Sequence, residues 1–158
     1  MSKRSHRRPG PPADLDPYQG CGADAEIGVE PLAVGWLRRN RPYPQGSVPP
    51  GFLAELLTFC QEPLTVCVRP VAERCPLCGE HPPPIMNDGR PVVLGAAEIR
   101  VIGETEIYAA PTLIVHFVAE HDYMPPEAFI TAVTTGPPAG SPEHRALVRA
   151  LRTIGSRD

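Results

Sequence analysis

The fold is decided by two short stretches, RCPLCG at residues 74–79 and HFVAEH at residues 116–121. The first carries a C-x2-C pair followed by glycine, and the second carries an H-x4-H pair. Two thiolates and two imidazoles form a complete tetrahedral ligand set for a structural zinc ion. The predicted metal ligands are Cys75, Cys78, His116 and His121.

The spacing of these residues indicates a zinc site that differs from a DNA-reading finger. Cys78 and His116 are separated by 37 residues, more than the short loop of such a finger contains. His116 and His121 are five positions apart, which is about 140° around a regular helix. His121 can therefore reach the metal only if the helix tightens or ends near it. His81, three residues after Cys78, is the alternative ligand in place of one helical histidine.

Four protein ligands favour a structural over a catalytic zinc ion, because hydrolytic zinc keeps one position for water. The sequence contains neither H-E-x-x-H nor an H-x-E paired with P-C-x-x-C. We therefore expect a protein that is not an enzyme. The alternative is a metalloenzyme with an open zinc site, in which Glu73, His81 or Glu120 would act as the base.

Composition favours a cytoplasmic protein. No run approaches the roughly 18 apolar residues that span a bilayer, and the basic start MSKRSHRRPGPP has no apolar stretch behind it. Of the five cysteines, Cys60 and Cys67 lie in apolar patterns that predict burial, and Cys21 lies in a loose segment that predicts a free thiol. A reducing cytosol favours metal binding over a disulfide for the CxxC pair.

Charge divides the chain into an acidic body and basic ends. Residues 43–142 hold four basic and eleven acidic residues, a net charge of 4 − 11 = −7. This argues against nucleic-acid binding by the body, which would need clustered Lys and Arg. We predict a disordered basic tail over 1–26, a zinc-stapled domain over 27–136, and a linker with a basic amphipathic helix over 137–158.

Apolar spacing predicts the elements between these boundaries. Residues 52–60 and 126–135 have the 3/4 spacing of helices with one buried face, and 64–68 is a β-branched run typical of a strand. Residues 97–109 alternate around Gly103-Glu104-Thr105 and predict a hairpin. Pro111 then opens the helix that carries His116. The prediction is an α+β fold, with a CxxC knuckle, a β-hairpin and the HxxxxH helix flanked by other helices.

The second half of the chain resembles a family of small bacterial, actinobacterial-type proteins of unknown function. Its pattern is roughly CxxC…EIRV…YAAPxLIxHYxxxHxYxPPxxFxxAV, and the matching stretches here are CPLC at 75–78, AEIRV at 97–101, YAAPTLIVHF at 108–117 and HDYMPPEAFITAV at 121–133. The resemblance covers about residues 30–135. It implies a zinc-finger-like core and brings no established activity. Where the pattern often has a histidine before the first cysteine, this chain has Glu73.

Together these features predict a non-enzymatic zinc-binding protein that acts through protein–protein interaction, as an adaptor, small regulator or immunity-type partner. The expected partner is another protein, with no membrane involved. Besides the open-site metalloenzyme, a second alternative is nucleic-acid binding through the arginine-rich tails.

Overall fold

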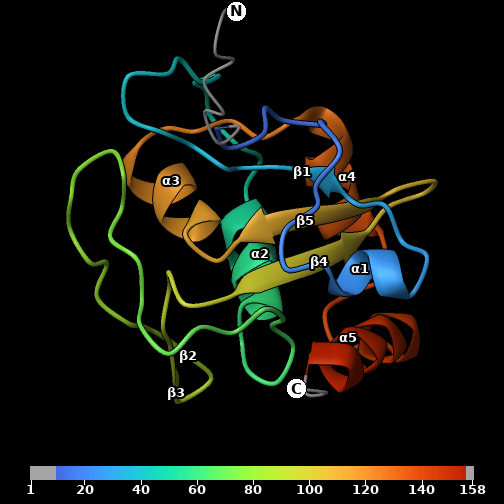
Figure 1. The fold of residues 1–158 in the computed structure, drawn as a ribbon. Helices are drawn as coiled ribbons and strands as arrows, with labels where there is room; N and C mark the ends of the chain where they lie inside the picture. The colour runs from blue at the N-terminus through green and yellow to red at the C-terminus, as the bar shows by residue number, and fades with distance from the viewer. Residues whose placement is uncertain (1–9, 156–158) are drawn as a thin grey trace, which may run out of the picture.

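A computed structural model describes residues 10–155 and places them in an α+β fold around a three-stranded sheet (Figure 1). The strands are β1 (Leu32–Ala33), β4 (Glu98–Ile102) and β5 (Ile107–Pro111), in the order β1-β5-β4. β4 and β5 form the predicted hairpin, with Ile102 opposite Ile107. β1 joins the other edge of β5 in parallel. Pro111 ends β5 instead of opening a helix, so the next helix begins slightly later than predicted.

Three helices enclose the main core with this sheet. They are α2 (Phe52–Phe59), α3 (Ile114–Glu120) and α4 (Glu127–Thr135), which confirms the predicted helical segments. α2 contacts α3, α4 and β4, and Phe52 and Tyr108 both pack edge-on against Phe129. No helix in the described part of the chain is long and apolar enough to cross a membrane.

The segment between α2 and β4 departs from the prediction. The expected strand over 64–68 is reduced to a single antiparallel bridge between Val66 and Glu98, because Cys67 adopts a left-handed backbone with φ 51° that ends extended pairing. The turn at Asn87-Asp88-Gly89 forms, and it joins two short strands, β2 (Ile85–Asn87) and β3 (Arg90–Val92), in a separate hairpin.

The N-terminal arm also differs from the prediction of a disordered tail over 1–26, of which residues 1–9 lie outside the described range. Within residues 10–26, Leu15 N–H donates to Ala33 O, and α1 (Ala23–Glu26) packs against the body. The ring of Tyr18 stacks on Trp36, whose indole Nε1–H donates to Ala109 O on β5. Aromatic anchoring therefore compensates for the low apolar content of this arm.

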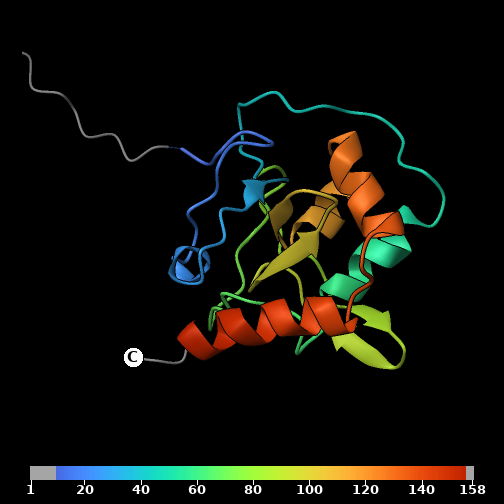
Figure 2. The same cartoon turned by 90° about the vertical axis from the view of Figure 1, so that its right-hand side faces the viewer.

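The C-terminal helix α5 (Pro142–Gly155) packs on the body, a point that the sequence leaves open. It runs along α1 and β4 (Figure 2). Val148 and Leu151 are buried against Ala23 and Val66 in a second, smaller core. The predicted boundary at residue 137 therefore does not separate this helix from the fold.

His144 on α5 is fully buried, and both ring nitrogens have partners. Gly140 N–H donates to Nδ1 at 3.1 Å, so Nε2 carries the proton and donates to Arg100 O at 3.0 Å. If Nδ1 were protonated, its N–H would face the N–H of Gly140, and neither group would have an acceptor in the other. Burial, opposed by the Arg100 carbonyl, lowers the His144 pKa below its usual range.

These contacts predict a pH-dependent contribution of His144 to stability. The unfolded chain, with a histidine pKa near about 6.5, binds a proton more readily than the folded protein. The stabilisation is therefore complete at higher pH and is lost as pH falls below about 6.5. We expect His144→Asn to lower the free energy of unfolding by roughly 2 kcal/mol at pH 8, with a smaller difference at pH 5.5.

Urea denaturation at both pH values measures this difference, and His81→Asn, at an exposed histidine, controls for loss of an imidazole. A difference between His144→Asn and wild type that stays constant with pH would contradict the neutral, buried tautomer.

Candidate metal centre

The CxxC knuckle is a tight turn closed by its own backbone. Gly79 N–H donates to Cys75 O at 2.8 Å, and Cys75 N–H donates to Glu80 O at 2.9 Å. Gly79 has a φ of 75°, in the left-handed region that favours glycine. The Leu77 N–H also points at the Cys75 Sγ, 3.4 Å away. This turn sets both cysteine side chains on one side.

The two histidines lie close together because α3 ends just before His121. His116 lies within the helix, whereas His121 is its C-cap with φ −122° and ψ 16°, and Asp122 follows with a left-handed φ of 52°. The Tyr43 hydroxyl donates to His121 O at 3.0 Å and holds this turn. The unwinding moves His121 from its helical direction to the side that faces His116.

The ligand atoms of the four predicted side chains converge on one point. All of them lie within 4.8 Å of one another. Nε2 of His121 is 3.2 Å from Nε2 of His116 and 3.5 Å from Sγ of Cys75, and Nε2 of His116 is 3.5 Å from Sγ of Cys78. Bond lengths at tetrahedral zinc place two nitrogens about 3.3 Å apart and nitrogen and sulfur about 3.6 Å apart. The observed separations fit a tetrahedral metal ion.

The electrostatic environment suits metal binding. Burial, together with the neighbouring His121, lowers the His116 pKa against the opposing effect of Glu120 and Glu80, so the ring is neutral at pH 7 with a lone pair for a metal. Burial raises the Cys75 pKa, so this thiol keeps its proton until a cation displaces it. Cys75 is buried while Cys78 is exposed, which places the site at the protein surface.

The alternative residues lie apart from this cluster. His81 is exposed and is not a member of the four-residue group. Glu73 forms an ion pair with Arg69, and its backbone N–H donates to Gly95 O, which fixes the chain entering the knuckle. Glu120 is exposed at the end of α3. The four ligands predicted from the sequence are therefore the ones that the fold brings together.

Sequence reasoning missed a second group of interacting side chains on the other side of the sheet. Cys21 and Cys67 form a disulfide, where we expected a free thiol and a buried apolar residue. Arg100 is fully buried beside them and forms ion pairs with Asp24 and Glu98. The available signal was the pair of alternating charged residues in β4, Glu98 and Arg100. Such alternation is typical of a solvent-exposed strand face, but here α1 and α5 cover that face.

The geometry predicts that the purified protein holds one metal ion per chain, and that Cys75→Ser and His116→Ala lose it. If the free ion is at about a thousand times its dissociation constant, linkage stabilises the fold by about 4 kcal/mol, or roughly 10 °C in melting temperature. Metal analysis after dialysis against a weak chelator, with thermal unfolding, checks both values.

The matched control is His81→Ala, which removes a nearby imidazole and should leave metal content and melting temperature unchanged. Metal loss in His81→Ala, or normal folding of both ligand variants without metal, would contradict the assignment.

Comparison with known proteins agrees with an uncharacterised family. A family model described as a domain of unknown function, DUF7919, matches residues 12–134. No curated protein and no solved structure matches the chain. The matched range contains the four converging side chains and the whole three-stranded sheet. The chain therefore belongs to this family, the domain of unknown function DUF7919.

Proposed function

We propose that this protein binds zinc through Cys75, Cys78, His116 and His121 and uses it to hold together a surface for another protein. The supporting observation is the convergence of two sulfur and two nitrogen atoms within 4.8 Å. Soft thiolates with imidazoles favour zinc over magnesium or calcium, which prefer oxygen ligands. Four protein ligands also fill the tetrahedral shell, which favours a structural, non-enzymatic role over an open catalytic site.

The proposed zinc would add a direct link between the knuckle and α3. The knuckle follows a long irregular segment after α2, in which only Val66 forms a β-bridge within the described residues. His116 and His121 belong to α3, which is buried through Ile114, Val115, Phe117 and Val118. A metal bond between them would fix the knuckle on the core, and structural zinc in small domains contributes on the order of 10 kcal/mol.

An exposed apolar surface beside the knuckle supports a protein partner. Val71 is 74% exposed and Val93 is 53% exposed. The Arg69 N–H donates to Ala96 O and the Glu73 N–H to Gly95 O, so the segment with Val71 runs beside the one with Val93. The knuckle begins at Cys75, directly after this segment. Large exposed apolar patches mark protein interaction sites, and these two valines would contribute to such a patch.

The arginine-rich C-terminal segment gives less support to nucleic-acid binding. Arg152 donates to Thr65 O at 2.7 Å, and Arg145 donates to Gly140 O at 2.7 Å. These guanidinium groups bind the protein's own backbone and are less free to meet phosphates. A cytoplasmic location remains part of our proposal.

Cobalt substitution tests the closed site. Co²⁺ in place of zinc should give the strong visible absorption of a four-coordinate ion with sulfur ligands, and azide should leave that spectrum unchanged because no position is open. His116→Ala, which should lose the metal, is the control and should not develop this absorption. An azide-dependent shift in the wild-type spectrum would instead support the metalloenzyme alternative.

Crosslinking in cells tests the surface. A photo-reactive amino acid at position 71 should give a discrete crosslinked species that disappears with Cys75→Ser, because the surface depends on the metal. The same amino acid at position 104, exposed at the tip of the β4–β5 hairpin, is the control. Equal crosslinking at both positions, or none at position 71, would contradict a partner at this surface.

A further inference from the structure

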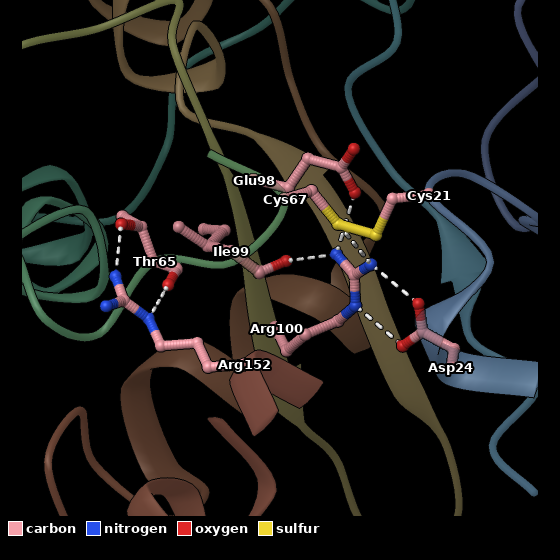
Figure 3. Close-up of a disulfide and its surroundings, with 8 residues drawn as sticks. All are labelled: Cys21, Asp24, Thr65, Cys67, Glu98, Ile99, Arg100 and Arg152. Carbon is pink, nitrogen blue, oxygen red and sulfur yellow. Dashed lines mark hydrogen bonds and ion pairs between the residues drawn. A yellow bond between two sulfur atoms is a disulfide. The ribbon is translucent and has the colours of Figure 1, made fainter. Parts of the chain in front are cut away.

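A second sulfur pair lies far from the metal centre, where three segments meet (Figure 3). Cys21 precedes α1 in the N-terminal arm, and Cys67 follows the bridge between Val66 and Glu98. The two form a disulfide across 46 positions of sequence. The bond links the arm to the irregular segment after α2.

A buried group of charged side chains lies beside these sulfurs. The Arg100 Nη2 lies 3.8 Å from the Cys67 Sγ. A Glu98 carboxylate oxygen lies within 4.8 Å of both sulfurs. Arg100 donates to Glu98 Oε1 at 3.0 Å and to both Asp24 oxygens at 2.8 and 2.9 Å. Glu98, Arg100 and Asp24 are each at most 4% exposed, so their positions are fixed.

The two sulfurs are chemically unequal. Cys21 is exposed, whereas Cys67 is half-buried and faces the guanidinium of Arg100. A thiolate attacks the accessible sulfur, and the departing sulfur leaves faster when its negative charge is stabilised. These two conditions select Cys21 as the sulfur attacked and Cys67 as the sulfur that leaves.

A cavity of about 1230 Å³ opens beside the disulfide. Its wall includes both cysteines, and arginines from α5 and from the segment after Cys67 also line it; they are Arg69, Arg145, Arg149 and Arg152. Glu26 and Glu98 are the acidic residues of the wall, and Arg100 pairs with both Glu98 and Asp24. Arg69 pairs with Glu73, and Arg145 and Arg152 donate to backbone carbonyls but keep their charge. The wall therefore keeps a net positive charge that complements an anionic molecule.

We propose that Cys21–Cys67 is a thiol–disulfide exchange site for a carboxylate-bearing low-molecular-weight thiol that binds in this cavity. The thiol sulfur forms a bond to Cys21 Sγ, and the Cys21–Cys67 bond breaks with its electron pair going to Cys67 Sγ. The proton of the incoming thiol passes through the Glu98 carboxylate to Cys67.

A second thiol then attacks the mixed disulfide and releases the small-molecule disulfide, leaving Cys21 and Cys67 as thiols. Two electrons are thereby transferred from two thiols to the protein. Glu98 is needed because its carboxylate and that of Asp24 together outnumber the single cation of Arg100. Once Glu98 has taken the proton of the incoming thiol, Arg100 can stabilise the charge that develops on Cys67 until Glu98 delivers the proton.

The test uses full-length oxidised protein and reduced glutathione as the anionic thiol. After acid quenching and alkylation of free thiols, intact-mass and peptide analysis should find glutathione on Cys21 and the alkyl group on Cys67. At low salt, glutathione should react roughly tenfold faster than the cationic thiol cysteamine, relative to their rates with a small disulfide, and salt should reduce this preference.

Two variants separate the parts of the proposal. Arg149→Glu, at an exposed cavity residue, should abolish the preference for glutathione, whereas Arg90→Glu on the β2–β3 hairpin should retain it. Glu98→Gln should slow the glutathione reaction at least roughly tenfold. Its reduction by a carboxylate-bearing phosphine should be no slower than that of wild type, because a phosphine brings no thiol proton to remove.

Several outcomes would overturn the proposal. These are failure of Cys21 and Cys67 to form a disulfide when the protein is oxidised, glutathione attached to Cys67, or equal preference for the two thiols. Equal slowing of the phosphine and glutathione reactions in Glu98→Gln would show a general structural effect and would likewise reject Glu98 as the proton carrier.

Discussion

The architecture around the candidate metal centre depends on the convergence of two sulfurs and two imidazole nitrogens within 4.8 Å. The knuckle lies at the end of an irregular segment that is joined to the body by backbone hydrogen bonds of Val66, Arg69 and Glu73, while α3 is anchored in the main core. Neither arrangement by itself requires the four ligand atoms to meet. The left-handed Asp122 and the hydroxyl of Tyr43 at the end of α3 show that the helix is terminated in the way that brings His121 into the group.

The other side of the sheet has a different organisation. Arg100, at the centre of β4, is buried between Asp24 of the arm and Glu98, and His144 of α5 donates to its carbonyl. Removing one partner of a buried ion pair commonly lowers the stability of a protein by about 3–5 kcal/mol. Both terminal segments are therefore connected to one residue of the sheet, and the disulfide lies against the same charged group.

The sequence allows prediction of the parts that depend on local patterns. Apolar spacing identifies α2, α4 and α5, alternation identifies the β4–β5 hairpin, and residue chemistry identifies the four converging side chains. The rest depends on contacts between distant segments. Glu98 and Arg100 have the pattern of an exposed strand face, and only the arm and α5 bury them. No local feature of the sequence around Cys21 predicts Cys67 as its disulfide partner. The N-terminal arm has the composition of a disordered segment, and the stacking of Tyr18 on Trp36 holds it against the body.

We thus propose two sulfur chemistries for this protein, a closed metal site at the knuckle and an exchangeable disulfide beside buried charges. X-ray absorption at the zinc edge of the purified protein measures the ligands of the proposed metal site. We expect two sulfur neighbours at about 2.3 Å and two nitrogen neighbours at about 2.0 Å. A first shell that lacks sulfur, or that includes a fifth, oxygen ligand, would contradict the proposed site.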